Sequence, residues 1–267
     1  MRVVNKVHIK NSRGLYFAGI LCLSLLMLAM PSHSMTQTDV PQAAPASDGY
    51  DYPVKGGTEE WRAFQTHDEM LKACQIPEDI LNSMSTRALV ETVLEYPLYG
   101  DMRAYNTIQQ GFEAVASQFN GLPELLNRKD AGTELLAIYS KMDPLDIEDN
   151  WGDVQKGAYT LSIADVEILL AQNRILDNLS RIQLEDLIAE ARLKYTAKRQ
   201  SAIYGPTGQG YSIWLMGKAL QRADYLPFER QVDQDAAIRN FLGSGFYATD
   251  IVANEIVSNT DQFLSGQ

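Results

Sequence analysis

The stretch SIADVEILLAQNRILDNLSRIQLEDLIAEARLKYTAKRQ, residues 162–200, decides the fold class of this chain. Apolar residues recur in it every three to four positions, a spacing that is typical of amphipathic α-helices. The residues that carry this pattern are Val166, Leu169, Leu170, Ile175, Leu176, Leu184, Leu187, Ile188 and Tyr195. We therefore predict one helix that begins at Ser162 and a second from about Arg181 to Gln200.

Signals for helix starts extend this pattern along the rest of the chain. Thr66 opens a Thr-His-Asp-Glu capping box. Either Ser85 or Thr86 is expected to cap the helix that carries Leu89, Val93 and Leu94, and Thr107 precedes another apolar helical stripe. Further helical patterns lie near residues 229–242 and 249–264. Because the alternation typical of strands is scarce, we predict an all-α fold of many short helices, packed as one irregular or solenoid-like domain.

The last third of the chain contains a glycine-rich segment followed by an apolar one. YSIWLM, residues 211–216, fits either a short strand or the start of a helix, and the preceding GPTGQG, residues 205–210, is expected to form a turn. That turn lacks the Lys-Ser or Lys-Thr of a P-loop and the second glycine of the dinucleotide fingerprint. Residues 243–245, Gly-Ser-Gly, fail the nucleophile-elbow pattern because Leu242 occupies its first glycine position.

The first 34 residues have the order of a secretory signal peptide. A basic segment without acids precedes an apolar run from Leu15 to Met30, and Pro31 and then Ser-His-Ser follow, with small residues on either side of one larger one. This order predicts export to an extracytoplasmic or secreted location, with cleavage after Ser34. The alternative is an uncleaved membrane anchor, but a spanning helix needs ~20 apolar residues. This run is shorter and is interrupted by Gly19 and Ser24.

The rest of the chain divides by composition. Residues 35–57 are rich in Pro, Ala, Gly and Ser without an apolar period, which predicts a flexible leader. Residues 58–267 are expected to form the helical domain. If this domain has two halves, the seam lies in the connector at residues 143–160.

The charge balance excludes several classes of partner. The chain has 23 basic residues, of which four lie in the predicted signal, and 34 acidic residues, of which none does, so the mature chain carries 19 basic residues and a net charge of −15. Nucleic-acid binding draws its affinity from Lys and Arg on phosphates, so this balance argues against it. It also argues against docking on anionic lipid, and we predict no membrane insertion after signal cleavage.

Few residues suited to metal binding or nucleophilic catalysis remain after signal cleavage. His67 and Cys74 are then the remaining histidine and cysteine, too few for the usual zinc sites. They lie seven residues apart on one predicted helix, ~10 Å by helical rise, which is too far for a catalytic dyad. We expect Cys74 to be a buried thiol, and a disulfide-bonded homodimer through it is the alternative.

The connector between the predicted helices is strongly acidic. Its carboxylates are Asp143, Asp146, Glu148, Asp149 and Asp153. Oxygen ligands on a flexible loop suit Ca²⁺. The spacing fails the EF-hand test, however, because counting from Asp146 places Trp151 at the sixth position and Gly157 at the twelfth. A solvated acidic turn is the favoured interpretation, a calcium site is the alternative, and we predict no other cofactor.

From Tyr52 onward the chain carries a characteristic order of segments: CQIPEDIL, MSTRALVETVLEYPLYGDM, QQGFEAV, FNGLPELLNRKD and ELLAIY. This order resembles a group of exported bacterial helical proteins with a CQIP…MST…L…YP…GFEA…FNG…ELL.R pattern. The later YGPTGQGYSIWLM is similar to the group more loosely. The resemblance implies export and a shared helical fold, and it assigns no activity and no catalytic residue to this chain.

These observations leave two classes of function. The favoured hypothesis is a non-enzymatic binding module that recognises a protein or glycan partner at the cell surface, because catalytic motifs are missing. The alternative is a carboxylate-based extracellular hydrolase acting on glycans or peptides. A pocket with two close acids of raised pKa would favour the hydrolase. An exposed apolar or aromatic patch without such a pair would favour the binding module.

Overall fold

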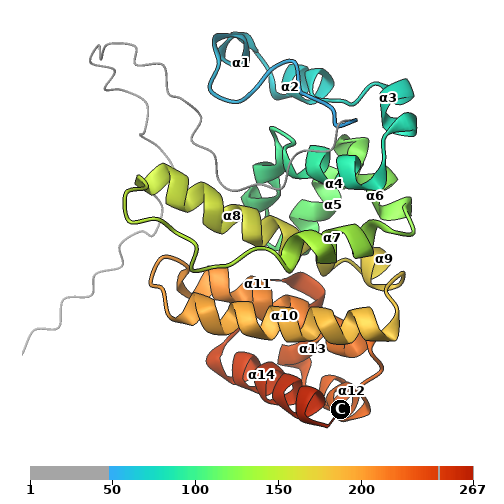
Figure 1. Ribbon diagram of the computed structural model, residues 1–267, viewed down its shortest axis with the longest axis vertical. Helices are drawn as coiled ribbons and strands as arrows, with labels where there is room; N and C mark the ends of the chain where they lie inside the picture. Colours follow the sequence, from blue (N-terminus) through green and yellow to red (C-terminus); the bar gives the residue numbers. More distant parts are fainter. Residues whose placement is uncertain (1–47, 246, 267) are drawn as a thin grey trace, which may run out of the picture. The chain divides into compact units, whose positions relative to one another are not determined.

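The computed structural model describes residues 48–245 and 247–266, which contain helices and no strand (Figure 1). The helices of the first part are α1 (Glu59–Ala63), α2 (His67–Ala73), α3 (Glu78–Ser83), α4 (Thr86–Leu94), the 3₁₀ helix η1 (Tyr99–Ala104), α5 (Ile108–Gln118), α6 (Gly121–Asn127) and α7 (Ala131–Tyr139). Those of the second part are α8 (Asp153–Leu170), α9 (Asn173–Leu176), α10 (Arg181–Arg199), α11 (Gly205–Arg222), α12 (Leu226–Gln234), α13 (Ala236–Ser244) and α14 (Asp250–Ser265). The predicted all-α class of many short helices is confirmed.

The predicted caps begin these helices. The side chains of Thr66, Ser85 and Thr107 each accept a hydrogen bond from the backbone N–H three residues further on. Such caps satisfy N–H groups that have no partner within the helix. The caps predicted at Thr66 and Thr107 are therefore confirmed, and of the two candidates for α4 the cap is Ser85.

The end of the predicted leader packs against α4. The predicted signal peptide, residues 1–34, and the leader up to residue 47 lie outside the described residues. Tyr52 is 3% exposed, and its hydroxyl donates to the Thr92 carbonyl oxygen at 3.1 Å. The Tyr50 N–H donates to Thr92 Oγ1 at 3.1 Å, and the two tyrosine rings meet edge to face. The packed chain therefore starts before Thr58, the predicted first residue of the helical domain.

Residues 205–216 are helical, which corrects both the predicted turn and the possible strand at 211–216. They form the first three turns of α11. Pro206 suits a helix start because its missing N–H would have no partner there. A side chain at Gly208 would come within 3.1 Å of Tyr204, so glycine lets that ring lie against the helix. Glycines lower helix propensity, but the burial of Trp214 and its neighbours outweighs this here.

Helix α8 begins at Asp153, nine residues before the predicted start. The Gly152 N–H is satisfied by Gln155 Oε1 at 3.1 Å, and the carboxylate of Asp153 lies in the first turn, where the helix dipole favours it. The apolar stripe is absent from these turns because Val154 and Leu161 point to solvent. The second half of the predicted 143–160 connector is therefore helix.

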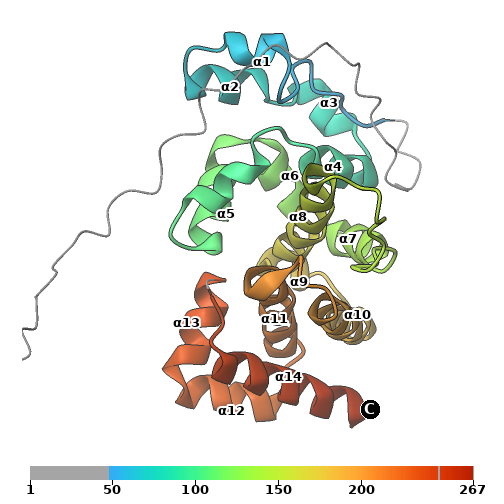
Figure 2. The same cartoon turned by 90° about the vertical axis from the view of Figure 1, so that its left-hand side faces the viewer.

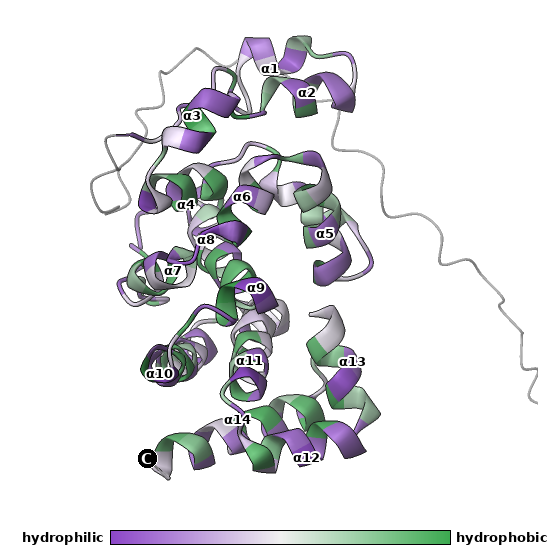
Figure 3. Ribbon diagram, turned by 90° about the vertical axis from the view of Figure 1, so that its right-hand side faces the viewer, coloured by the Kyte–Doolittle hydropathy of each residue, from purple (hydrophilic) through white to green (hydrophobic). Residues whose placement is uncertain are grey.

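The described residues belong to one compact unit, in which α8, α10 and α11 are central. Helix α11 packs along α10 and also contacts α8, α13 and α14 (Figure 2). Helix α12 turns its hydrophobic side, including buried Phe228 and Val232, toward α11 and α13, and its hydrophilic side away (Figure 3). On the other side of the unit, α5 contacts η1, α6 and α13.

The position of α5 depends on one glycine. A Cβ atom added to Gly111 would lie 1.8 Å from the carbonyl oxygen of Met102, so any larger residue would push η1 off α5. Both Gly111 and Met102 are buried. This close approach holds α5 in place as one wall of the groove described below.

None of the helices in the described part of the chain is both apolar and long enough to span a bilayer.

Candidate functional site

A groove of about 620 Å³ opens between helices that are far apart in the sequence. Its walls are one face of α5, part of α6, the turn from α8 to α9, α11 and the end of α13. Helices α5 and α13 lie on the same side of α11 in two opposite views (Figures 2 and 3). The lining residues are Gln109, Phe112, Glu113, Ala116, Ser117, Pro123, Leu126, Gln172, Asn173, Arg174, Lys218 and Gly243.

The wall formed by α5 is a polar stripe beside apolar residues. Gln109, Glu113 and Ser117 are four residues apart, so they lie above one another on the helix. The Gln109 amide donates to Glu113 Oε1 at 2.9 Å, which fixes both side chains along the helix. Phe112 and Ala116 add apolar surface next to this stripe. The wall therefore offers hydrogen-bonding groups and one carboxylate together with apolar contact area.

The turn from α8 to α9 supplies the opposing polar groups. The Gln172 amide is buried and donates to the Ile168 carbonyl oxygen at 2.8 Å. Arg174 donates to Asn127 Oδ1, which ties the start of α9 to the end of α6. Asn173 lies between these two and is exposed. This turn thus brings one guanidinium and two amides to the groove.

Lys218 is the half-buried cation contributed by α11. Within residues 48–245 and 247–266, its ammonium group has no hydrogen bond or ion pair. Burial lowers the pKa of Lys218, and the more distant carboxylate of Asp177 opposes that change. A second hollow of about 310 Å³ adjoins the groove, and both Lys218 and Asn173 line the two. Lys218 therefore stands at the junction of two hollows.

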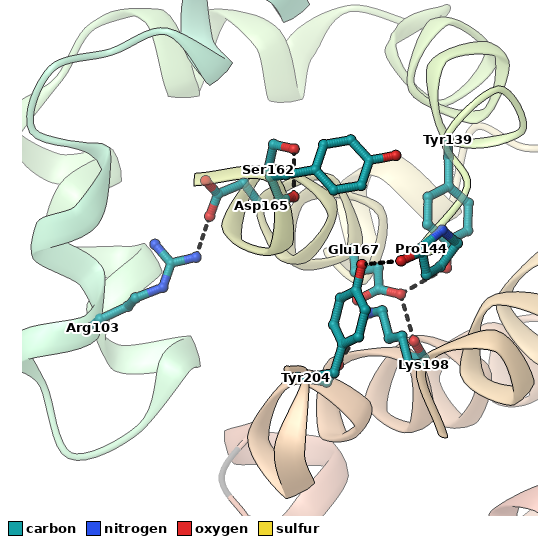
Figure 4. Close-up of polar contacts among 11 residues, drawn as sticks. Arg103, Tyr139, Pro144, Ser162, Asp165, Glu167, Lys198 and Tyr204 are labelled. Carbon is teal, nitrogen blue, oxygen red and sulfur yellow. Dashed lines mark hydrogen bonds and ion pairs between the residues drawn. The ribbon is translucent and has the colours of Figure 1, made fainter. Parts of the chain in front are cut away.

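A second group of polar residues lies in the core, and we call it the Glu167 cluster. Lys198 Nζ is 2.6 Å from Glu167 Oε2, and Tyr139 and Ser212 donate their hydroxyls to Glu167 Oε1 at 2.8 and 2.6 Å. The ammonium of Lys198 also donates to the Gly208 carbonyl oxygen at 3.1 Å. The four side chains are fully buried, and they converge from α7, α8, α10 and α11 (Figure 4).

The surroundings of the Glu167 cluster close it from solvent. Lys194 lies with its Nζ 4.5 Å from the centre of the Tyr139 ring and pairs with Glu190 at 2.7 Å. Tyr204 packs beside Lys198 and donates to the Pro144 carbonyl oxygen at 2.7 Å. Each carboxylate oxygen already has a partner, so the cluster has no position for a ligand. We interpret it as a device that joins four helices.

The opposite face of α8 carries another ion pair. Arg103 reaches from η1 to the Asp165 carboxylate, and the Tyr99 hydroxyl donates to the Asp165 backbone oxygen at 3.4 Å (Figure 4). Burial raises the pKa of Asp165 to about 6, although Arg103 acts in the opposite direction. Asp165 and Glu167 thus bind η1 and α10 to the two faces of one helix.

The five acidic residues considered for calcium are exposed. They are Asp143, Asp146, Glu148, Asp149 and Asp153. Asp143 Oδ1 accepts the Leu145 N–H at 2.9 Å, and Asp153 belongs to the first turn of α8. No group of three or more His, Cys, Asp or Glu that could hold a metal ion is present within residues 48–245 and 247–266. The geometry gives the calcium alternative no support, and it stays a prediction.

Cys74 is buried as predicted, with 1% of its surface exposed. Burial also raises the pKa of its thiol. A disulfide to a second chain would require this side chain to leave the core. His67 is exposed, and its Nε2 lies 3.3 Å from Asp101 Oδ2. Neither residue lines the groove.

Comparison with protein-family models, with curated proteins and with solved structures finds no match to this chain. The resemblance to exported bacterial helical proteins therefore stays a prediction.

Sequence reasoning missed the groove for a physical reason. Its residues come from five separate regions between positions 109 and 243, and no local spacing connects them. The local signal in the sequence is a row of polar residues, Gln109, Glu113 and Ser117, along one side of the amphipathic helix α5. A stripe of that kind is also what an ordinary solvated helix face looks like.

Proposed function

We propose that this chain is an exported, non-enzymatic binding module and that the groove between α5, α9 and α11 holds its ligand, a segment of a partner protein or a glycan. The main support for this proposal is the set of residues that line the groove. Apolar side chains alternate with amides and fixed charges, the mixture that lets a site bind and orient an organic ligand. The predicted signal peptide supports a partner at the cell surface.

The same lining favours binding over hydrolysis. Glycoside hydrolysis by two carboxylates needs them about 5–10 Å apart, on either side of the scissile bond. Among the residues that line the groove, Glu113 is the one carboxylate. Asp165, whose pKa burial raises, is paired with Arg103 and does not line the groove. The acid–base pair on which the hydrolase hypothesis depends is therefore not assembled around this groove.

The groove chemistry suits a polar polymer with some apolar surface. Gln109 and Asn173 provide amide donors and acceptors, as peptide bonds and sugar hydroxyls require. Phe112, Pro123 and Leu126 supply apolar contact for side chains or sugar rings. Because the predicted mature chain carries a net charge of −15, nucleic acid stays disfavoured as the partner.

A thermal-shift screen against peptides, oligosaccharides and cell-wall fragments tests this proposal. A ligand present at 100 times its dissociation constant adds ~2.7 kcal/mol to the stability of the folded state, which moves the midpoint by several degrees. Ser117→Trp places a bulky ring in the groove. Ser258→Trp is the matched control, because Ser258 is exposed on α14 and does not line the groove.

The proposal expects a ligand that raises the midpoint of the wild-type protein and of Ser258→Trp, and that fails to raise the midpoint of Ser117→Trp. An equal rise in all three proteins would place the ligand elsewhere. Conversion of an oligosaccharide or peptide into shorter products during the screen would favour the hydrolase instead.

A further inference from the structure

The buried and half-buried lysines Lys194, Lys198 and Lys218 differ in whether their ammonium groups are paired with a carboxylate. Lys194 and Lys198 each lie within 2.7 Å of a carboxylate oxygen, supplied by Glu190 and Glu167. Lys218 is half-buried, and the described part of the chain gives its ammonium group neither a hydrogen bond nor an ion pair. Unpaired ammonium groups are normally kept in full contact with water. Lys218 departs from that pattern at a place where a groove reaches it.

The charges of the groove favour an anion at Lys218, and the carboxylate of Asp177 in the adjoining hollow is already paired with Arg222 at 2.9 Å. Arg174 lines the same groove, and its guanidinium is held by the uncharged Asn127. Glu113 is the acidic residue of the lining, and Gln109 holds its carboxylate along α5. The groove therefore carries two cationic side chains and one anionic side chain, in a chain with far more acids than bases. Its local charge has the opposite sign to that of the whole protein.

The position of Lys218 indicates where in the groove an anion would bind. Lys218 and Asn173 line both the groove and the adjoining hollow, so an anionic group between them would be reached from either side. An amide N–H beside an ammonium forms a pair of donors suited to carboxylate or phosphate oxygens. Because burial lowers the pKa of Lys218, a bound anion would also restore the charged form.

We infer that Lys218 binds an acidic group of the ligand, a carboxylate or a phosphate, at the junction of the two hollows. This inference rests on the proposed function and names the ligand chemistry that the groove selects. The remainder of the ligand lies along α5, where Phe112 and Ala116 offer apolar contact beside the polar stripe. The ligand is thus an extended molecule with an acidic group at one point along it.

The test observes Lys218 directly and uses inorganic phosphate and acetate as probes. The purified protein is labelled with ¹³C-lysine, and the ε-carbon resonance of Lys218 is assigned by its loss in Lys218→Arg. Lys72, exposed on α2, is the internal control. Each anion is titrated against chloride at constant ionic strength, so that screening acts equally on both lysines.

We expect the Lys218 resonance to shift saturably with at least one anion, with a dissociation constant at least tenfold below that of any shift at Lys72. The pKa of Lys218 rises at the same time. Preference for phosphate or for acetate identifies the acidic group. Equal responses of Lys218 and Lys72 to both anions would overturn the inference.

A second measurement separates this inference from the proposed function. For a ligand found by the thermal-shift screen, Lys218→Met is expected to weaken binding at least tenfold, whereas Lys218→Arg keeps most of the affinity. If Ser117→Trp abolishes binding while Lys218→Met leaves it unchanged, the groove binds its ligand without an acidic contact and the inference fails alone. If Lys218 binds anions but Ser117→Trp leaves ligand binding intact, the proposed groove fails instead.

Discussion

Lys198 and Lys218 lie on neighbouring helices, α10 and α11, but they differ in burial and in ion pairing. Lys198 belongs to the Glu167 cluster, where a carboxylate, two hydroxyls and a backbone oxygen leave no polar group unpartnered. Lys218 borders the groove and has no such partner within the described residues. An ammonium in the core is normally paired, because burying it without a partner costs several kcal/mol of unfolding free energy. An ammonium group at a groove keeps part of its hydration, so it can stay unpaired until a ligand binds.

This contrast separates two roles of charge in one fold. The Glu167 cluster joins α7, α8, α10 and α11. Its hydrogen bonds form only when these four helices meet in one arrangement, so the cluster fixes how they pack. The groove residues satisfy one another only in part, as with Gln109 and Glu113. A complete network indicates a structural role, and an incomplete one at an opening indicates a binding role.

The largest effect is expected from Lys198→Met. Removal of the cation leaves the Glu167 carboxylate buried without a counter-charge, which costs about 3–5 kcal/mol of unfolding free energy. In a domain of this size each kcal/mol moves the thermal midpoint by roughly 2–4 °C. Urea unfolding of the purified variant, compared with wild type, gives the difference directly.

The matched control for Lys198→Met is the double variant Glu167→Gln with Lys198→Met. It removes both charges and keeps an amide oxygen as acceptor for Tyr139 and Ser212, so it should be more stable than the single variant. If Lys198→Met alone costs less than ~1 kcal/mol, the cluster is not the structural element described above.

A smaller, pH-dependent effect is expected from Asp165. Its folded-state pKa is raised from 3.8 to about 6, so between those values the folded protein binds more protons than the unfolded chain. The contribution of Asp165 to stability therefore increases as the pH falls from about 6 to 4 and is lost as it rises again. Relative to Asp165→Asn, the wild-type protein should gain on the order of 2 kcal/mol over that window.

Urea unfolding at several pH values measures this difference. The quantity of interest is the change with pH and not the offset, because Asn also weakens the contact with Arg103. Parallel stability profiles for the two proteins between pH 4 and 6.5 would show that Asp165 titrates as an ordinary surface carboxylate.

The smallest effect is expected from Lys218→Met. The substitution removes a half-buried ammonium that makes no hydrogen bond or ion pair within the described residues, so the unfolding free energy should stay within about 0.5 kcal/mol of wild type. The same substitution is thus expected to lower the unfolding free energy strongly at Lys198 and hardly at all at Lys218. A loss above ~2 kcal/mol at Lys218 would reveal a structural role and weaken the contrast.

The sequence predicts the individual helices better than it predicts their assembly. Thr66, Ser85 and Thr107 mark helix starts correctly, because capping depends on residues within one turn. The pattern fails where packing overrides local preference. Gly208 is typical of a turn, yet α11 forms there because burial of Trp214 and its neighbours outweighs the low helix propensity of glycine.

The site residues could not be predicted from local patterns. Glu167 and Lys198 are 31 positions apart, and each looks like a solvated charge on an amphipathic helix. Lys218 follows the apolar segment YSIWLM without any motif around it. Conversely, the carboxylates of the acidic connector lie close together in sequence, as a metal site would require, yet they are exposed, four in the loop before α8 and Asp153 in the first turn of that helix. Only the tertiary contacts distinguish these cases.

The most direct test of the binding role assigned to the groove is chemical-shift mapping. The ¹⁵N-labelled protein is titrated with the ligand that gives the largest midpoint rise in the screen, and the perturbed amides are located. We expect them to cluster at Gln109, Ser117, Asn173 and Lys218, on helices that meet only in the folded protein. Perturbations confined to other surfaces, such as the exposed turns of α8 or α14, would contradict it.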